Sequence, residues 1–259
     1  MRDGIDEYTL LCEKCGYVIE GLPREGACPE CAKPVAESLP ERREGTAWQR
    51  APTWRSFVRT VVSTLRHPLG TIAVMQIDER SVRSFRWRAL LVSGALIGLP
   101  LAVAAAPLVR GPVRPLFAFI VLPCATAGIA VLLAFLTLLE CEGLCVLGRT
   151  KGARLTKAVA VTVTSFGCSG WIAGVSGTGL LLCACVPVTL LDMVWIDHGT
   201  HQSPGFSETG WDVLDAVAWV FWFPPILGFL FFEVFAWLGL RRCRFANRAR
   251  PETEGSQGS

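Results

Sequence analysis

The sequence has 259 residues, of which 51% are hydrophobic and only 18% are charged, and its formal net charge is +3. This composition fits a membrane protein with a modest aqueous portion. Residues 158–191 contain no charged side chain, and such a run excludes an ordinary soluble globule, whose helices would show a polar face. The net charge by itself points to no class of partner.

The first feature along the chain is a set of four cysteines in metal-ligand spacing. Cys12 and Cys15 form one CxxC pair, Cys28 and Cys31 form a second, and twelve residues separate the pairs. Two tight turns of this kind supply four thiolates to one tetrahedral ion. We therefore predict a zinc ribbon over residues 1–34 that holds one structural zinc ion. A pair of disulfides and a rubredoxin-like iron site are the alternatives.

The residues around these cysteines indicate the role of the ribbon. No apolar run precedes the cysteines, so we expect a cytosolic N-terminus without a secretory signal. A module this small cannot bury enough apolar surface to fold alone, so the metal must stabilise it. Its cations are balanced by acids, namely Lys14, Arg24 and Lys33 against Glu13, Glu20, Glu25 and Glu30. We therefore expect no nucleic-acid partner, and either an unknown protein docked at the ribbon or a purely architectural role.

Between the ribbon and the membrane, we predict a linker and an amphipathic helix. Residues 35–52 are polar and rich in Pro, as in a linker. A helix is predicted over residues 53–67, with Thr53 as its N-cap and Pro68 ending it. Its apolar stripe contains Trp54, Phe57, Val58, Val61, Val62 and Leu65. This pattern predicts a helix in the membrane interface or one packed on the cytosolic ends of the spans.

Four arginines precede the first apolar run and mark the cytosolic face of the membrane. They are Arg80, Arg83, Arg86 and Arg88. Basic residues at this position attract anionic lipid headgroups and favour the inner side of the membrane. We therefore expect the lipid bilayer, with anionic headgroups near these side chains, as a partner.

Residues 68–240 are predicted to form an all-α polytopic membrane bundle of about five transmembrane helices. The helices are expected at about residues 88–109, 115–140, 158–174, 178–196 and 212–240. Residues 158–191 are too long for one crossing, and Gly174, Gly177 and Gly179 mark the expected turn between two short ones. Glycines spaced four residues apart, such as Gly94 and Gly98, let helices approach closely and leave a homo-oligomer open.

The charges of the loops do not give one consistent topology for five spans. With the N-terminus inside, the basic loop 141–157 also falls inside, as the positive-inside rule requires. A fifth span then places the acidic loop 192–215 inside and the tail 241–259, which is basic and then polar, outside. A single long crossing over residues 158–191 would repair both assignments. The side of the tail therefore stays open at this point.

The middle of the chain resembles a known membrane family. The likeness is carried by residues 67–99, 144–152, 155–158 and 165–167, which give a His-Pro entry, two spans, a Gly-Arg-x-x-Gly loop and a glycine-rich hairpin. Over roughly residues 67–240 the chain resembles the Yip-type domain, a five-span family named for Ypt/Rab-interacting proteins. The resemblance implies a cytosolic N-terminus and a role in membrane organisation or vesicle trafficking. The chain lacks the Asp-Leu-Tyr-Gly-Pro motif of the eukaryotic members, which are linked to small GTPases.

The sequence contains no nucleophile elbow, P-loop or dinucleotide fingerprint, so we expect a protein that is not an enzyme. The alternative class is a transporter or a membrane-embedded enzyme. It would use Glu233, an ionisable residue inside the last apolar run, together with a loop that contains His198 and His201. A Glu that reaches the interface and an ordinary surface loop are the simpler interpretations of these residues.

Overall fold

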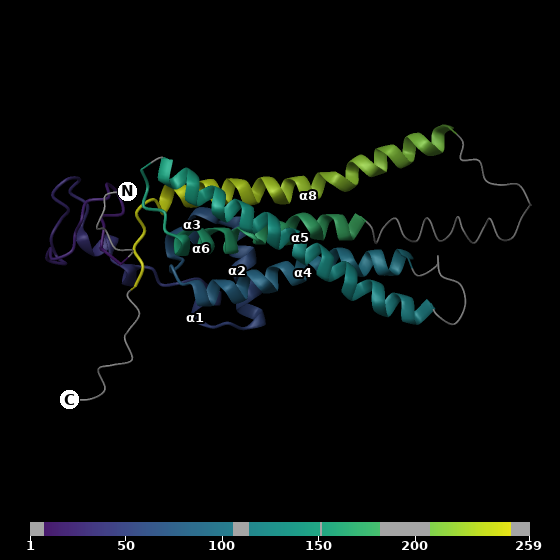
Figure 1. The fold of residues 1–259 in the computed structure, drawn as a ribbon, viewed down its shortest axis with the longest axis horizontal. Coiled ribbons are helices and arrows are strands. Elements are labelled where there is room, and N and C mark those ends of the chain that lie inside the picture. Colours follow the sequence, from purple (N-terminus) through teal and green to yellow (C-terminus); the bar gives the residue numbers. More distant parts are fainter. Residues whose placement is uncertain (1–7, 106–113, 151, 182–207, 250–259) are drawn as a thin grey trace, which may run out of the picture. The chain divides into compact units, whose positions relative to one another are not determined.

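The computed structural model describes residues 8–105, 114–150, 152–181 and 208–249. Within these residues the regular secondary structure is helical, which confirms the predicted all-α class (Figure 1). The elements are η1 (Val35–Ser38), η2 (Pro40–Arg42), α1 (Ala47–Arg50), α2 (Trp54–Arg66), α3 (Pro68–Val74), α4 (Glu79–Ala105), α5 (Arg114–Thr150), α6 (Lys157–Gly167) and α8 (Glu208–Arg242), with further helical residues at 169–181.

Four stretches of helix are long and apolar enough to cross a membrane. They are Glu79–Ala102, Phe119–Gly148, Lys157–Leu181 and Phe223–Arg242. Large apolar side chains such as Phe119 and Leu180 stay exposed, at 78% and 72% of their surface. These helices are consistent with an integral membrane protein. A fifth span is not found among the described residues, and most of the predicted helix 178–196 lies outside them.

The helices are longer than the apolar runs that predicted them. α4 begins at Glu79 rather than near residue 88, because Asp78 caps it: the backbone N–H groups of Arg80 and Ser81 both donate to the Asp78 carboxylate at 3.1 Å. The four arginines that were expected to precede the span therefore lie within the helix. α5 likewise continues to Thr150 instead of ending near residue 140.

The predicted turn at Gly174, Gly177 and Gly179 is wrong, because all three residues lie in a continuous run of helix. Gly174 instead takes part in close helix packing, together with Gly228 of α8. A Cβ atom at Gly174 would lie 2.8 Å from the carbonyl oxygen of Pro224, and one at Gly228 would lie 2.5 Å from that of Gly170. Only glycine fits such backbone contacts, as in other small-residue membrane interfaces.

The chain divides into two compact units. Unit 1 contains Met1–Arg86, Leu138–Gly167 and Val234–Ser259, and unit 2 contains Trp87–Thr137 and Cys168–Glu233. The chain therefore leaves unit 1 twice and returns to it twice.

Unit 1 has an aromatic core that includes part of the predicted linker. Trp48 is fully buried, and its ring lies 6.1 Å from that of Phe57 and 6.0 Å from that of Phe85. The indole N–H of Trp48 donates to the carbonyl of Ser81 at 2.9 Å. Residues 35–52 are thus folded, and the linker prediction is wrong. A single hydrophobic residue in a polar stretch, such as Trp48, forms no pattern that predicts its burial.

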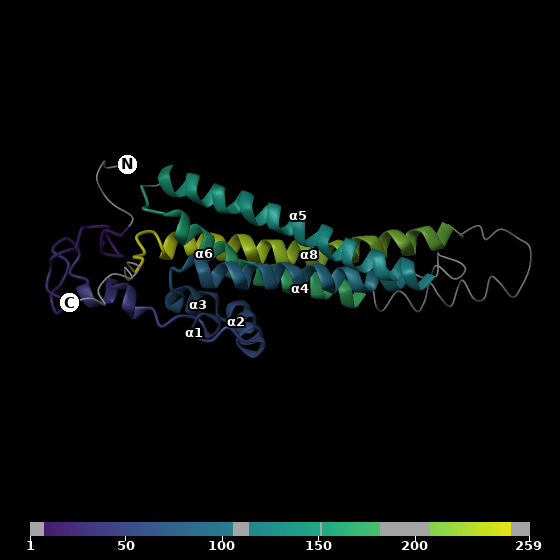
Figure 2. The same cartoon turned by 60° about the horizontal axis from the view of Figure 1, so that its bottom comes forward.

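Helix α2 matches its prediction closely, with Thr53 accepting a hydrogen bond from the backbone N–H of Ser56. It lies beside α1 and α3 (Figure 2). Phe57 and Val61 are buried in unit 1, as expected for a helix packed on other helices, whereas Trp54 and Val58 on the same stripe remain more than half exposed. α2 therefore has a packed apolar face and a second apolar face that points outward.

In unit 2, aromatic and small polar side chains join the helices. The indole N–H of Trp171 donates to Thr137 Oγ1 at 3.3 Å, and Thr137 in turn donates to the carbonyl of Leu133 at 2.7 Å. The ring of Trp171 stacks on that of Phe232 at 5.1 Å. The polar groups of both residues are thus satisfied within a largely apolar unit.

Candidate metal centre

The four predicted cysteine ligands come together in unit 1. Their sulfur atoms all lie within 4.8 Å of one another, with Cys12 Sγ 3.5 Å from Cys31 Sγ and Cys15 Sγ 3.5 Å from Cys28 Sγ. A disulfide needs about 2.05 Å between sulfurs, so these pairs are not disulfides. Four thiolates at about 2.3 Å from a tetrahedral zinc ion lie roughly 3.8 Å apart, close to the observed separations. The cluster therefore fits one metal ion.

Two similar turns present these sulfur atoms. In the first, the backbone N–H of Gly16 donates to the carbonyl of Cys12 at 2.8 Å, and in the second, the N–H of Ala32 donates to the carbonyl of Cys28 at 2.9 Å. Gly16 has φ +80° and Ala32 has φ +57°. The backbone of Ala32 thus lies in the left-handed region although the residue is not glycine, at a cost of about 1 kcal/mol.

The protonation of the thiols shows why a cation suits this cluster. Burial raises the pKa of the Cys12 thiol, but the backbone N–H groups of Cys15 and Lys14 and the Cys31 side chain outweigh it, so the pKa falls to about 6. Burial, together with the side chains of Cys28, Cys31 and Cys12, raises the pKa of Cys15 to about 12. The thiolate of Cys12 forms readily, whereas that of Cys15 is resisted until a cation balances the charge.

The ribbon has a small core of its own. Ile19 and Val35 are buried with Cys12 and Cys28, and Leu39 is among the partly buried residues that pack against them. The folded module therefore extends past the predicted boundary at residue 34. Even with these residues the apolar core is small, so metal binding must supply much of its stability.

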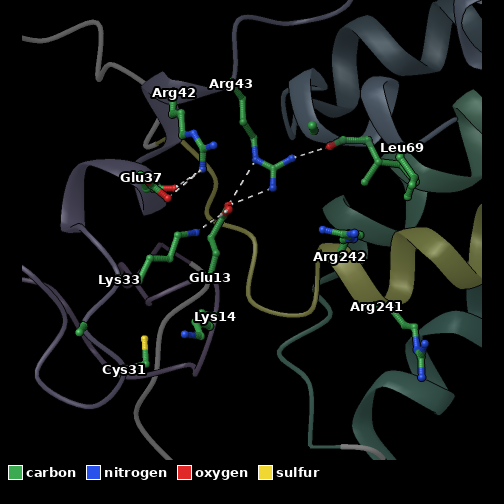
Figure 3. A pocket seen from close by; sticks show the side chains of 13 residues that line it. Glu13, Lys14, Cys31, Lys33, Glu37, Arg42, Arg43, Leu69, Arg241 and Arg242 are labelled. Carbon is green, nitrogen blue, oxygen red and sulfur yellow. Dashed lines mark hydrogen bonds and ion pairs between the residues drawn. The ribbon is translucent and has the colours of Figure 1, made fainter. Parts of the chain in front are cut away.

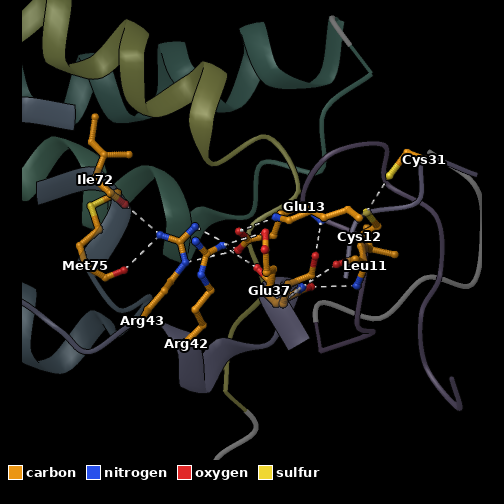
Figure 4. A network of polar contacts seen from close by, with 12 residues as sticks. Leu11, Cys12, Glu13, Cys31, Glu37, Arg42, Arg43, Ile72 and Met75 are labelled. Atoms are coloured by element: carbon orange, nitrogen blue, oxygen red, sulfur yellow. Dashed lines mark hydrogen bonds and ion pairs between the residues drawn. The ribbon is translucent and has the colours of Figure 1, made fainter. Parts of the chain in front are cut away.

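Arg43 joins the ribbon to α3 through a buried ion pair (Figure 4). Its guanidinium donates to the Glu13 carboxylate at 3.0 Å and to the backbone carbonyls of Ile72 and Met75 at 3.0 and 3.3 Å. Arg43 is only 6% exposed. The adjacent Cys243 thiol is fully buried, and burial raises its pKa to about 11. The residue after the first metal ligand is thus fixed to a helix outside the ribbon.

Asn247, in the C-terminal segment, binds the other side of the ribbon. Its side-chain amide accepts from the backbone N–H of Leu11 at 2.9 Å and donates to the carbonyls of Leu11 and Ser38 at 2.6 Å each. Arg154 donates to the Asn247 side-chain oxygen at 3.0 Å and also to the carbonyl of Thr9. The amide therefore satisfies backbone groups of the ribbon as a neighbouring strand would.

The ring of Phe245 covers the first metal-binding turn. A Cβ atom at Gly16 would lie 2.7 Å from a ring carbon of Phe245, so a larger residue would displace the ring or the turn. Together with Asn247, this contact makes the segment 243–249 part of the ribbon's surroundings. The basic tail predicted over residues 241–259 is therefore, in its described part, a folded element of unit 1.

The other predicted site residues are not brought to this centre. Glu233 lies in α8 within the candidate span Phe223–Arg242, where its side chain is partly exposed, and it belongs to unit 2. His198 and His201 lie outside the described residues. The described structure therefore gathers only the four cysteines into a candidate site.

Sequence reasoning missed Arg43, Arg154 and Asn247, which position the ribbon. Each is separated from its ribbon partner by 30 or more residues and carries no periodic or motif signal. Such contacts become visible only once the fold brings the segments together.

A comparison of the chain with protein-family models, with curated proteins and with solved structures finds no match.

Proposed function

We propose that this chain is a non-enzymatic integral membrane protein whose zinc ribbon is an architectural and docking module at the cytosolic face. The observation that carries the proposal is the set of contacts that fixes the ribbon to Arg154, through the carbonyl of Thr9, and to Asn247, through Leu11. Four cysteine ligands leave no open position on a tetrahedral ion for water or substrate, which favours a structural metal. Zinc is the metal that this ligand set suits best.

The same contacts support a topology in which the ribbon and the tail share one side of the membrane. The ribbon precedes the first candidate span, Arg154 lies between the second and third, and Asn247 follows the last. Side chains that hydrogen-bond to one another directly cannot be separated by a bilayer. We therefore propose an even number of crossings, for which the four candidate spans are sufficient.

This topology also removes the conflict between the charges and the spans. Four crossings place the basic loop 149–157 and the arginine-rich tail on the ribbon's side, and the acidic segment 192–215 on the opposite side. Basic loops on the cytosolic side follow the positive-inside rule. The cytosol is thus the compartment we propose for the ribbon, where a reducing environment also keeps its thiols available for metal.

The bilayer is the partner that we propose for the outward face of α2. Trp54, Val58 and Val62 are exposed along it, and Arg55 and Arg59 are exposed beside them. An apolar stripe with Trp, flanked by arginine, suits the boundary between headgroups and acyl chains. Arg80 and Arg83 in the first turns of α4 are also exposed, as contact with anionic headgroups requires.

The resemblance of residues 67–240 to Yip-type domains is the basis for proposing a role in membrane organisation or trafficking, with an unknown protein docked at the ribbon. A five-span domain and the four-span arrangement differ in one observable property, the side of the tail. The ribbon's contacts with Asn247 support the even number.

The metal is tested by elemental analysis of the purified full-length chain. We expect one equivalent of zinc per chain in the wild type and less than about a tenth of that after Cys15→Ser, because three thiolates hold zinc far more weakly than four. Cys124→Ser is the matched control, since Cys124 is exposed in α5 and belongs to unit 2. Unchanged zinc in Cys15→Ser, or stoichiometric iron in the wild type, would contradict the zinc ribbon.

A further inference from the structure

A polar pocket of about 670 Å³ lies in unit 1 beside the ribbon (Figure 3). Its walls come from the ribbon, from η1, from the end of η2 and the residue after it, from α3 and from the end of α8. Six cationic side chains line it: Lys14, Lys33, Arg42, Arg43, Arg241 and Arg242. The ribbon's own charges are balanced, and the basic character arises because four of these cations come from outside residues 1–34.

The carboxylates of this pocket are already paired. Glu13 lies 3.0 Å from Arg43 and 4.0 Å from Lys33, and Glu37 lies 3.8 Å from Arg42. Two acids against six cations leave an excess of four positive charges in one cavity. Lys14, Arg241 and Arg242 are exposed to solvent there. Like charges gathered in a concave site attract a counter-anion strongly, because the cavity focuses their field.

The pocket is placed for an anion that carries an apolar part. Leu69, Ile72 and Ala73 of α3 form an apolar stretch of its wall. Arg241 and Arg242 are the last residues of the candidate span Phe223–Arg242, where a helix emerges into the headgroup region. The Arg241 guanidinium lies 4.3 Å from the centre of the Trp237 ring, and Trp is common at that depth. The guanidinium of a single arginine recognises a phosphate by two parallel N–H donors.

We propose that this pocket binds a phosphate-bearing anion, with Arg241, Arg242 and Lys14 as its principal ligands. An anionic phospholipid headgroup and a soluble phosphate present the same group to these side chains. Bound phosphate would balance the positive charges that the ribbon and the end of α8 contribute to the pocket. This inference goes beyond the architectural role proposed above, since it assigns the ribbon a ligand besides its metal.

The test uses the full-length, metal-loaded chain in a neutral maltoside detergent and isothermal titration calorimetry. The probes are dihexanoyl phosphatidic acid, dihexanoyl phosphatidylcholine and inorganic phosphate. We expect phosphatidic acid to bind and R241Q/R242Q to weaken its binding about tenfold or more, because charged hydrogen bonds to phosphate are lost. R24Q/R50Q removes the same charge from exposed positions of unit 1 that do not line the pocket, and it should change binding by less than about twofold.

Zinc content and thermal unfolding show whether each variant is folded, and K14Q decides the question if R241Q/R242Q is not. K14Q should weaken binding about threefold to tenfold, as loss of one charged contact does. Binding of both inorganic phosphate and phosphatidic acid, or of either alone, supports the phosphate site and identifies its source. The proposal is overturned if neither phosphatidic acid nor inorganic phosphate binds, if phosphatidylcholine binds as tightly as phosphatidic acid, or if R24Q/R50Q weakens binding as much as R241Q/R242Q.

Discussion

Unit 1 and unit 2 are stabilised by different kinds of contact. In unit 1, hydrogen bonds and an ion pair between distant segments fix the ribbon, through Arg43 and Asn247. In unit 2, glycines allow backbones to touch, as at Gly174 and Gly228, while many large apolar side chains remain exposed. Burial of apolar surface stabilises a fold in water but not in lipid. Helices in lipid therefore associate through close packing. The ribbon of unit 1 thus has the contacts of a module in water, whereas the helices of unit 2 have those of helices in lipid.

The largest effect is expected from removing the metal, which should destabilise the ribbon of unit 1 but not the helices of unit 2. Zinc binding contributes roughly 10 to 16 kcal/mol to small zinc modules, far more than the apolar core of this ribbon can replace. After chelation, we expect amide hydrogen exchange to lose protection over residues 10–39, and over the segment that contains Asn247. Helix residues 169–181 and 223–233 of unit 2 should keep theirs. Equal loss in both units would show that they do not differ in this way.

The next largest effect is expected for Arg43→Met, which leaves the Glu13 carboxylate and the carbonyls of Ile72 and Met75 without their donor. Removing one partner of a buried ion pair costs about 3 to 5 kcal/mol. Arg42→Met, at an exposed pair with Glu37, should cost less than about 1 kcal/mol. Chemical denaturation, with metal release as the signal for unfolding of the ribbon, would measure the loss of stability in both variants. A similar cost for the two variants would show that Arg43 does not hold the ribbon.

Unit 2 is tested by Gly228→Ala, because a Cβ atom there meets the backbone of Gly170 and Gly174. Overpacking of this kind costs about 1 to 3 kcal/mol. Gly128→Ala is the matched control, since a Cβ atom at Gly128 meets nothing within 4 Å. It should be neutral or slightly stabilising, as alanine favours a helix over glycine by about 1 kcal/mol. Thermal unfolding in detergent gives both values, and equal melting temperatures would rule out close packing at Gly228.

The smallest effect is expected at Asp78, which caps α4 in unit 1. Burial raises the pKa of Asp78, but hydrogen bonds from Ser81 and Arg80 outweigh it, so the pKa lies below its usual value. A carboxyl whose pKa is lower in the folded state stabilises the fold above its unfolded pKa, about 3.9, and loses this effect as the pH falls through the folded value. Asp78→Ala should therefore cost about 1 kcal/mol at pH 7. Melting temperatures of the two proteins should converge on acidification, and a constant difference would contradict the capping role.

The sequence predicted well those features that local chemistry determines. The four metal ligands follow from the CxxC spacing, and α2 follows from its cap at Thr53 and its apolar stripe. Apolar runs located all four candidate spans, although they placed the start of α4 too late, because Asp78 lies outside the run.

Features that depend on distant segments were not predicted. Trp48 sits in a polar stretch that looks like a linker, and only the fold shows that Phe57 and Phe85 surround it. Gly174 was expected at a turn because glycine permits turns and close helix contacts equally well, and the sequence alone does not distinguish them. The basic pocket was not predicted for a similar reason. Its cations come from the ribbon, from residues at the end of η2 and from the end of α8, and these segments are far apart in the sequence.

The central claim is that the ribbon and the C-terminal segment form one folded unit on one side of a membrane. A protease-accessibility assay tests this claim: a short protease-cleavable tag is placed at each end of the full-length chain, and sealed inside-out and right-side-out membrane vesicles are treated with the protease. We expect both tags to be cleaved in inside-out vesicles, whose cytosolic face is exposed, and both to be protected in right-side-out vesicles. Cleavage of one tag and protection of the other would contradict it.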